Sequence, residues 1–587
     1  MRIASTSFAI FAFRRGSKRG PSAAAHAMQT PREVQRRATP LRMTKCDLRW
    51  HPHAAMIAVL LSFMPIPSLA QNVPYERISH AQSEPQNWLT YSGSYSSQQY
   101  SPLKQINRQN VSNLKIAWMY QPQKPVANLE SSPIVVDGVM FITEPPSTVT
   151  ALDVRSGLKL WSYGPTLPEH IVSIGLYATS RGVAILDSMV YIGTADAHLI
   201  ALDAKTGAVR WNVHVADNVM GYAMTGPPLA LKDKIVVGIG GSEAAVRGFI
   251  DAYDAKTGKR LWRFWTTPRV GEPGAETWGP GAAESAGATT WNNGSYDPEL
   301  NLIYWGTGNP APDFNDDDRP GDNLYTCSLL TIDADTGKLK WYFQFSPHEN
   351  HDWDSAEPAV LFNATIDGKL RKLVGFANRN GFYYVLDRVT GKFITGVPFV
   401  KQTWAKGLDP KTGRPILAPD QQPTLGAGTL VYPSITGGVD WTSPSYSPQT
   451  GLFYVSAHET GAYYIKGTGK IEPGPPKGIV GGGGIRALLG DQSYGAIRAL
   501  EATTGKRKWE FRFLAPAWVP VLSTAGGLVF SGSDEGNFFA LDAETGKLLW
   551  DIQMGHSARS NPISYEVDGK QYVFVTAGNV YMAFTLP

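Results

Sequence analysis

The sequence predicts an all-β fold, an eight-bladed β-propeller with tryptophan-docking repeats. Three observations carry this prediction. A segment of the form Asp-x-x-Thr-Gly followed by Trp recurs along the 587-residue chain, and alternating apolar strands precede most of its copies. The composition is also rich in turn-forming and aromatic residues, with Gly 59, Pro 42, Trp 17 and Tyr 25. This combination is typical of β-rich repeat proteins.

The repeat is clearest in segment 151–161, Ala-Leu-Asp-Val-Arg-Ser-Gly-Leu-Lys-Leu-Trp, and in segment 201–211, Ala-Leu-Asp-Ala-Lys-Thr-Gly-Ala-Val-Arg-Trp. Further copies begin at Ala252, Thr331, Ala499 and Ala540, and one without the tryptophan begins at Val385. In each copy an apolar strand enters a turn in which Asp can bond turn amides and Gly supplies a positive φ. Several strands per repeat, at a spacing of about 40–50 residues, describe propeller blades.

The spacing of the copies gives the number of blades. The gap between Val385 and Ala499 is too long for one repeat, and segment 446–455 fills it with a divergent copy. The total is then eight. We expect the strand 114–118 to pair with the C-terminal strand around Tyr572–Thr576, which leaves no open sheet edge. Each repeat tryptophan is expected to wedge between neighbouring blades.

Residues 1–70 are set aside as a leader, with Met1 or Met43 as its start. A positive flank precedes an apolar run at 54–64, and Pro-Ile-Pro-Ser-Leu-Ala follows it. This pattern is typical of a secretory signal cleaved after Ala70 and predicts a periplasmic protein. The run is too short and too broken by proline for a stable membrane span, although an uncleaved anchor is the alternative. Residues 71–587 are then expected to form a single propeller.

Charge and cysteine content argue against several functions. Residues 1–70 hold 11 of the 54 Lys and Arg but only 2 of the 50 Asp and Glu, so the remainder has a net charge near −5. That balance does not favour nucleic acid as a partner. Cys46 lies in the leader and Cys327 stands alone, so no internal disulfide is possible. No Cys-x-x-Cys-His occurs, so no c-type haem is expected, and electrons would have to pass to another protein.

Two longer segments resemble a known family. The first, 87–115, contains Tyr-Ser-Pro-Leu-Lys-Gln-Ile-Asn, and the second, 291–312, begins Trp-Asn-Asn-Gly-Ser-Tyr-Asp and ends Trp-Gly-Thr-Gly-Asn-Pro-Ala-Pro. Both are similar to signatures of the alcohol dehydrogenases that depend on pyrroloquinoline quinone (PQQ), the methanol and ethanol dehydrogenase-like quinoproteins. The resemblance spans nearly all of residues 85–587. Ser92 is a departure, because the first signature usually has Gly there.

The resemblance implies a calcium site. Gly240-Gly-Ser-Glu243 and Gly306-Thr-Gly-Asn309 both follow alternating strands. Glycine-rich strand ends allow close backbone approach to a flat ligand, and Glu and Asn supply hard oxygens that suit Ca²⁺. Similarity to the family assigns the metal to Glu243, Asn309 and Asp354.

The resemblance also implies the catalytic groups. Asp354, in His-Asp-Trp-Asp, corresponds to the family's base, and Arg379, before Asn-Gly, corresponds to the cation at the quinone oxygens. The chemistry needs a carboxylate to accept the hydroxyl proton and a cation to meet the charge that develops on the quinone. Asp352 is the rival for the base.

The PQQ site is expected to be flat and polar. Trp291 resembles the tryptophan on which the ring system stacks, and a large aromatic face suits such stacking. Further positions similar to those that contact PQQ are Glu130, Arg181, Thr225, Gly241, Ser242, Thr289, Arg379, Asp440, Trp441 and Trp518. Asp440 stands where many relatives have Asn, so its contact could differ.

Three further features qualify the resemblance. Many relatives carry adjacent cysteines whose disulfide covers the quinone, and segment 173–178 has none. Ala356 lies two residues after Asp354, where lanthanide-dependent relatives place a second Asp, which favours calcium. The glycine run 481–484 lacks the Lys-Ser/Thr of a phosphate-binding loop and is interpreted as an ordinary loop.

The function implied is oxidation of a small-molecule alcohol to an aldehyde or ketone. PQQ on Ca²⁺ takes the electrons, and an external acceptor such as cytochrome c receives them. Two alternatives remain at this point. One is a quinoprotein that acts on sugars or polyols. The other is a non-enzymatic propeller scaffold of the outer-membrane assembly type, which would have no use for Glu243, Asn309, Asp354, Arg379 and Trp291 together.

Overall fold

The computed structural model describes residues 72–122, 129–168, 171, 179–284, 286–468, 483–488 and 492–587. The chain separates into two units, 1–66 and 67–587, and the described residues all belong to the second. The predicted leader and segment 173–178 lie outside the described residues. None of the helices within the described ranges is long and apolar enough to cross a membrane.

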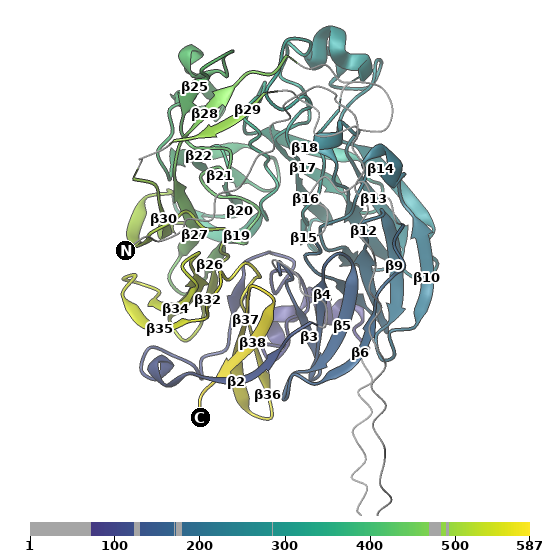
Figure 1. The fold of residues 1–587 in the computed structure, drawn as a ribbon, viewed down its shortest axis with the longest axis vertical. Coiled ribbons are helices and arrows are strands. Elements are labelled where there is room, and N and C mark those ends of the chain that lie inside the picture. Colours follow the sequence, from purple (N-terminus) through teal and green to yellow (C-terminus); the bar gives the residue numbers. More distant parts are fainter. Residues whose placement is uncertain are drawn as a thin grey trace, which may run out of the picture. The chain divides into compact units, whose positions relative to one another are not determined.

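Eight antiparallel sheets in the described residues have the strand order of propeller blades, and Figure 1 shows them arranged in a ring. Blades 1 to 4 follow one another along the chain with four strands each. They are β3 (Ile134–Val136), β4 (Val139–Glu144), β5 (Thr148–Asp153) and β6 (Lys159–Tyr163); β7 (Ala184–Leu186), β8 (Met189–Gly193), β9 (His198–Asp203) and β10 (Val209–His214); β11 (Leu229–Leu231), β12 (Lys234–Gly238), β13 (Phe249–Asp254) and β14 (Arg260–Trp265); β15 (Ser295–Asp297), β16 (Leu302–Gly306), β17 (Ser328–Asp333) and β18 (Leu339–Gln344).

Blades 5 to 8 continue the series, and blade 8 combines both ends of the described chain. They are β19 (Val360–Ile366), β20 (Lys369–Ala377), β21 (Phe382–Asp387) and β22 (Phe393–Pro398); β26 (Ser445–Ser447), β27 (Leu452–Glu459), β30 (Tyr494–Glu501) and β31 (Arg507–Phe513); β32 (Leu522–Thr524), β33 (Leu528–Gly532), β34 (Asn537–Asp542) and β35 (Leu548–Gln553); β36 (Ile563–Val567), β37 (Lys570–Ala577), β38 (Val580–Thr585) and β2 (Lys115–Tyr120). The predicted propeller and its divergent copy at 446–455 are confirmed.

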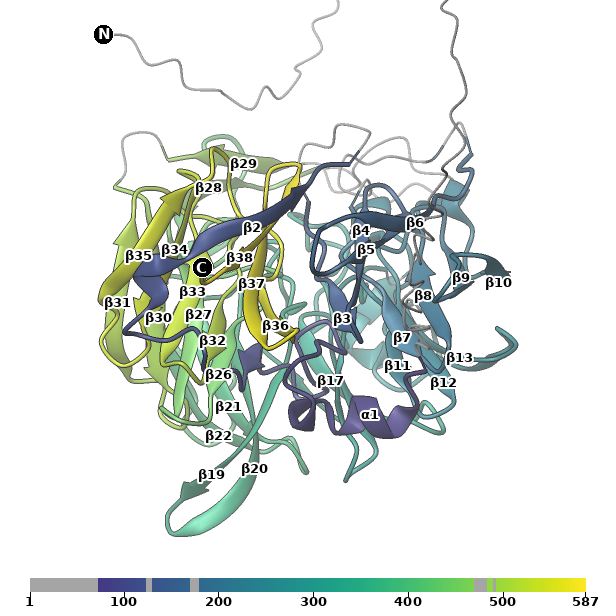
Figure 2. The same ribbon diagram turned by 90° about the horizontal axis from the view of Figure 1, so that it is seen from below.

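The remaining elements lie outside the four-stranded blades. β1 (Tyr100–Ser101) adds to blade 7 parallel to β32, β23 (Ala405–Leu408) and β24 (Pro415–Leu417) form a hairpin, and β25 (Thr429–Val431), β28 (Ala462–Ile465) and β29 (Gly484–Ala487) form a small sheet. The helix α1 (Tyr75–Ser79) and the β19–β20 hairpin lie on one face of the ring, and β28 and β29 lie on the other (Figure 2). The short 3₁₀ helices are η1 (Ala81–Ser83), η2 (Val111–Asn113), η3 (Asn218–Met220), η4 (Ser242–Ala244), η5 (Ala275–Glu284) and η6 (Pro419–Gln421).

The repeat turns have the chemistry that the sequence predicts. In blade 2, Oδ1 of Asp203 accepts hydrogen bonds from the backbone N–H groups of Lys205 (3.1 Å) and Thr206 (2.9 Å) and from the Thr206 hydroxyl (2.8 Å). Gly207 follows with a φ of +73°. One aspartate thus satisfies the amides of the turn, and the glycine reverses the chain into the outer strand.

Several repeat tryptophans join one blade to the next. Trp161 of blade 1 donates its Nε1 hydrogen to Ala204 O of blade 2 (3.1 Å). Trp118, on β2 of blade 8, makes the same contact with Val154 O of blade 1 (2.8 Å) and so closes the ring. Equivalent bonds are donated by Trp211, Trp262 and Trp509. The predicted wedging between blades is confirmed.

The predicted partner of the closing strand is wrong by one strand. β2 pairs with β38, so that Trp118 lies opposite Ala583, and not with the strand around Tyr572–Thr576. That segment belongs to β37, which already has β36 on one side and β38 on the other. A strand has only two edges, and both edges of β37 are filled within the C-terminal meander.

Candidate active site

A cavity of about 330 Å³ is lined by loops from most of the blades. Its volume is that of a site for a small organic molecule. Eleven of the residues predicted from the sequence line it: Glu130, Arg181, Thr225, Gly241, Glu243, Trp291, Asp354, Arg379, Asp440, Trp441 and Trp518. The other lining residues are Thr179, Gly240, Asp352, Ile435 and Thr436.

Residues far apart in the sequence meet here because the first strand of each blade begins near the cavity. The lining residues that stand three or four positions before such a strand are Glu130, Arg181, Thr225, Trp291, Trp441 and Trp518. First strands of successive blades have the same direction in a propeller, so the loops that precede them converge on one face. The periodicity of the fold therefore brings side chains from the corresponding loops of six blades to one cavity.

Asp354 is held by three donors. Its Oδ1 accepts the backbone N–H of Asn309 (2.6 Å), and its Oδ2 accepts Nε1 of Trp291 (2.9 Å) and Nη1 of Arg379 (3.1 Å). Burial raises the pKa of the Asp354 carboxyl, and the Arg379 charge opposes that rise. A side-chain methyl at Gly308 would approach Oδ1 to 2.8 Å, so glycine permits this close packing.

Arg379 lies among three aspartates. Beside the bond to Asp354, its guanidinium is 3.8 Å from Asp440 Oδ1 and 3.9 Å from Asp352 Oδ2. These charges raise the pKa of the guanidinium against the effect of burial, so it stays positive. Its Nη2 donates to Ile435 O (2.5 Å), while its buried Nε has no hydrogen-bond partner among the described residues. A buried donor without a partner is costly, and it fits an acceptor atom on a ligand.

Asn309 lies beside the cavity rather than in its lining. Its Nδ2 donates to Asp313 Oδ1 (2.8 Å) and to Pro310 O (3.2 Å). These two acceptors orient the amide, and no donor to its Oδ1 is recorded in the described part of the chain. Sequence reasoning missed Asp313, which is 5% exposed. Burial and the charges of Glu243 and Asp354 raise its pKa well above the usual range.

Glu243 lines the cavity from η4, two residues after a glycine that cannot be replaced without a clash. Gly241 has a φ of +132°, and a methyl group there would lie 2.7 Å from Gly221 O. The intervening Ser242 turns away from the lining and bonds Thr289, with 2.8 Å between the two hydroxyl oxygens. Ser242 and Thr289 therefore support the loop that carries Glu243.

The donor set near Asp354 fits a hard cation. Glu243 and Asp354 offer carboxylate oxygens, and Asn309 offers an amide oxygen, which are the ligand types that Ca²⁺ prefers. Within the described ranges, no group of three or more His, Cys, Asp or Glu side chains is arranged to hold a metal. The predicted set contains only two such side chains, so its assignment to a metal stays a prediction.

Another part of the cavity lining combines aromatic rings with an arginine. The Arg181 guanidinium lies 4.9 Å from the ring centre of Trp291 and 4.8 Å from that of Trp441, and it pairs with Glu130 at 2.9 Å. Its buried Nε has no hydrogen-bond partner in the part of the chain that the structure describes. Indole faces beside a guanidinium with unused donor capacity fit a flat ligand that carries carboxylates.

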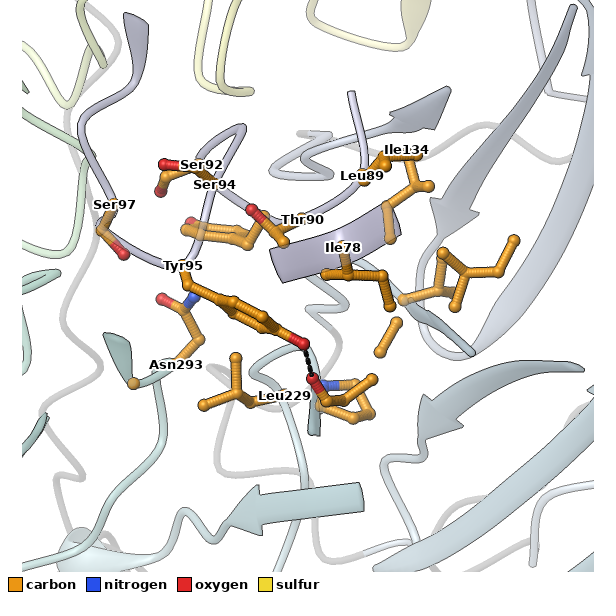
Figure 3. A pocket seen from close by; sticks show the side chains of 17 residues that line it. Ile78, Leu89, Thr90, Ser92, Ser94, Tyr95, Ser97, Ile134, Leu229 and Asn293 are labelled. Carbon is orange, nitrogen blue, oxygen red and sulfur yellow. Dashed lines mark hydrogen bonds between the residues drawn. The ribbon is translucent and has the colours of Figure 1, made fainter. Parts of the chain in front are cut away.

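A second, much smaller void lies near the N-terminal segment. It measures about 20 Å³ and is lined by Ile78, Leu89, Tyr95 and Leu229, among others (Figure 3). The Tyr95 hydroxyl donates to Ala230 O (2.6 Å) at its edge. A void of this size holds about one water molecule, so it is a packing defect and not a binding site.

Comparison with known proteins decides the family. The model "PQQ: Glucose/ethanol/alcohol dehydrogenase, beta-propeller domain" matches residues 88–407 and 515–573. The quinohemoprotein alcohol dehydrogenase ADH-IIG of Pseudomonas putida is 39% identical over 556 residues, which cover 89% of this chain and 77% of that protein. The chain belongs to the PQQ-dependent alcohol dehydrogenases. The prediction of an oxidoreductase enzyme of this family is confirmed.

Other relatives agree. The quinoprotein alcohol dehydrogenase PedH of Pseudomonas putida is 38% identical over 555 residues, covering 89% of this chain and 91% of PedH. The solved structure of a europium-containing methanol dehydrogenase superposes with a TM-score of 0.82 at 32% identity, covering 87% of this chain and all of that one. This PQQ-dependent dehydrogenase therefore has the fold of solved members of its family.

In this PQQ-dependent dehydrogenase, the family motifs did not assign a binding role to three acidic residues in or next to the cavity. These residues are Asp352, Asp313 and Glu357. Asp352 appears in the sequence only as a rival for the base, yet it lines the cavity. Glu357 is 3% exposed, and its Oε1 accepts the backbone N–H of Arg379 at 2.7 Å. The sequence signal for Asp352 and Glu357 was their position within three residues of Asp354. Proximity in sequence does not reveal which way a side chain points.

Proposed function

We propose that the chain is a periplasmic, calcium-containing dehydrogenase that oxidises an alcohol to the aldehyde or ketone, with Asp354 as the general base. The environment of Asp354 carries the proposal. Its carboxylate lines the cavity while three donors from separate segments, Trp291, Asn309 and Arg379, fix its orientation. A base must be held within hydrogen-bond reach of the proton that it accepts.

The roles of the neighbouring groups follow from their contacts. Asp354 accepts the hydroxyl proton of the alcohol on a carboxylate oxygen. When bound, PQQ supplies the two-electron acceptor. Arg379 lines the cavity and keeps its charge there, and this charge would stabilise negative charge on a bound oxygen. Trp291 and Trp441 would hold the flat ring system of PQQ, and Arg181 would bind its carboxylates.

Ca²⁺ is assigned to Glu243, Asn309 and Asp354. Their oxygens are hard donors, and a divalent cation offsets the repulsion among the buried carboxylates of this region. One relative is described as containing europium. Ala356 stands in this chain where the family resemblance places the second Asp of lanthanide-dependent members, and this supports calcium here.

Location and electron transfer are proposed from the sequence. The apolar run before Ala70 supports export to the periplasm. The sequence contains no Cys-x-x-Cys-His, so the electrons are proposed to leave to an external acceptor such as a soluble cytochrome c.

Asp354→Asn tests the proposed base. The amide keeps the size and part of the hydrogen bonding of Asp354 but removes the proton acceptor, so turnover should fall about 10²–10⁴-fold. The measurement is steady-state oxidation of a simple primary alcohol with an artificial electron acceptor, after loading with PQQ and Ca²⁺. Only variants shown by absorbance to hold equal PQQ are compared.

Asp352→Asn is the matched control for this test. It makes the same chemical change two residues away in the same cavity, and it should cost much less turnover on the simple alcohol. Equal losses in the two variants would contradict the assignment of the base to Asp354. A PQQ-loaded wild type that oxidises no alcohol would overturn the proposed function itself.

A further inference from the structure

The carboxylate of Asp352 lines the cavity, and its one printed contact with a charged group of the described residues is a long ion pair with Arg379. Its oxygens take part in no recorded hydrogen bond within the described residues, and the nearest cation, Nη2 of Arg379, is 3.9 Å away. Its side chain is 24% exposed, and it lines the cavity. A carboxylate that lines a binding cavity and accepts no hydrogen bond from the described residues is available to a ligand.

The backbone is built to point Asp352 this way. Asp352 has a φ of +64°, in the left-handed region that non-glycine residues rarely adopt. The buried Glu349 accepts both N–H groups of the turn, from His351 to Oε1 (2.5 Å) and from Asp352 to Oε2 (3.1 Å). The His351 ring stacks on Trp353 with 4.3 Å between ring centres and 7° between planes. The surrounding contacts therefore hold a strained conformation.

The other acidic groups of the cavity are accounted for. Glu130 pairs with Arg181 at 2.9 Å, and Asp440 accepts the backbone N–H of Trp441 at 2.9 Å. In the proposed function, Glu243 and Asp354 hold the metal. Asp352 then lies beside the reacting centre, because it and Asp354 both lie within 4 Å of the Arg379 guanidinium.

We propose that Asp352 is a specificity-determining residue that accepts a hydrogen bond from a second hydroxyl of the substrate. This inference rests on the proposed alcohol oxidation at Asp354. Two carboxylates close to one guanidinium are near enough for a short diol to bridge them, one hydroxyl at each. The substrate class is then a diol or polyol, and a monoalcohol of equal length leaves Asp352 without a partner.

A site built to bind a hydroxyl discriminates strongly against an analogue that lacks it. The PQQ- and Ca²⁺-loaded enzyme should therefore show a kcat/KM for 1,2-propanediol at least about tenfold higher than for 1-propanol. Asp352→Gly removes the carboxylate and suits the positive φ. It should lower kcat/KM for the diol about 10–100-fold more than for 1-propanol, mainly through KM.

Asp352→Asn is a second test variant, which keeps the inference testable if Asp352→Gly does not fold. The amide tolerates the left-handed conformation and still accepts one hydrogen bond, so the diol preference should fall by less. Glu349→Gln, which leaves one amide oxygen for two N–H donors, should change the same ratio in the same direction. All variants are compared at equal PQQ content.

The outcomes separate this inference from the proposed function. If the wild type oxidises both substrates and Asp352→Gly lowers both by the same factor, Asp352 only supports Arg379 and the inference is overturned. If the wild type prefers 1-propanol, the inference is likewise overturned, while the proposed function stands. If the PQQ-loaded wild type oxidises neither, both are overturned.

Discussion

Asn309 presents its amide in one orientation because Asp313 accepts the hydrogen bond of its Nδ2 at 2.8 Å. Groups that orient a metal ligand are often as important for affinity as the ligand itself. In this chain the orienting carboxylate is buried, so water cannot replace it.

Asp313→Asn should therefore weaken Ca²⁺ binding about 10–100-fold, since an amide at 313 can pair with Asn309 in either orientation. Titration calorimetry on the metal-free protein measures the affinity, and PQQ absorbance after dialysis reports the consequence. Asp317→Asn is the control, because Asp317 is 64% exposed and pairs with Lys466. Equal affinity in Asp313→Asn and the wild type would contradict this role.

Ionisation of the buried Glu349 side chain destabilises the folded state. Burial raises its pKa from 4.5 to about 7. In the unfolded chain the group ionises near 4.5, so between pH 4.5 and 7 the folded state binds more protons than the unfolded state. The free energy of unfolding therefore falls as the pH rises through this window, and this contribution to it stays constant at higher pH.

Glu349→Gln removes this dependence because an amide does not titrate. Relative to the wild type, the variant should gain about 2 kcal/mol of unfolding free energy between about pH 5 and pH 8. Urea denaturation of the metal- and PQQ-free proteins across this range measures the difference. A constant difference between the two proteins at every pH would rule out a raised pKa at Glu349.

Within a blade, the repeat turn serves two purposes at once. Gly207 supplies the positive φ of the turn in blade 2, and its α-carbon also forms the platform for Trp161 of blade 1. A methyl group at Gly207 would lie 2.6 Å from Cε3 of that indole. Local turn geometry and the packing between blades thus depend on the same residue.

Gly569 makes a matched comparison possible. It has a φ of +75°, close to the +73° of Gly207, but a methyl group there would meet nothing within 4 Å. Gly569→Ala should cost about 1 kcal/mol, from backbone strain alone. Gly207→Ala should cost about 1–3 kcal/mol more, since it also displaces the tryptophan. Denaturant unfolding measures both, and equal costs would refute the docking contribution.

The whole ring depends on one strand pair between distant parts of the chain. β2 pairs with β38, and Trp118 then reaches blade 1. β38 is therefore the only strand that connects β2 to the rest of blade 8 in the described residues. Without it, two strand edges and the apolar surface that Phe584 covers would be exposed.

Truncation after Asn579 removes β38 and should abolish cooperative folding and PQQ uptake. Removal of residues 586–587 alone, which lie beyond the strand, should leave both unchanged. Circular dichroism with thermal unfolding, together with PQQ absorbance after gel filtration, measures the two properties. A cooperative transition and bound PQQ in the protein that ends at Asn579 would show that ring closure is dispensable.

The sequence by itself determined the features that arise from a few neighbouring residues. The turn at Asp203 and Gly207 is encoded within five positions, which is why the blades can be counted from the repeat alone. The motif from Trp291 to Asn309 identified the family through resemblance, and eleven of the fourteen predicted site residues do line the cavity. Their individual roles toward PQQ and the metal stay predictions.

Only the tertiary structure decided which strand closes the ring and which side chains share the cavity. β38 and β37 have similar apolar sequences, and their pairing depends on which edge the C-terminal meander leaves open. Asp352 enters the cavity because of a positive φ and a buried Glu349, and Asp313 supports Asn309 from within the protein. These features depend on burial and on contacts between residues that folding brings together, and such contacts leave no periodic pattern in the chain.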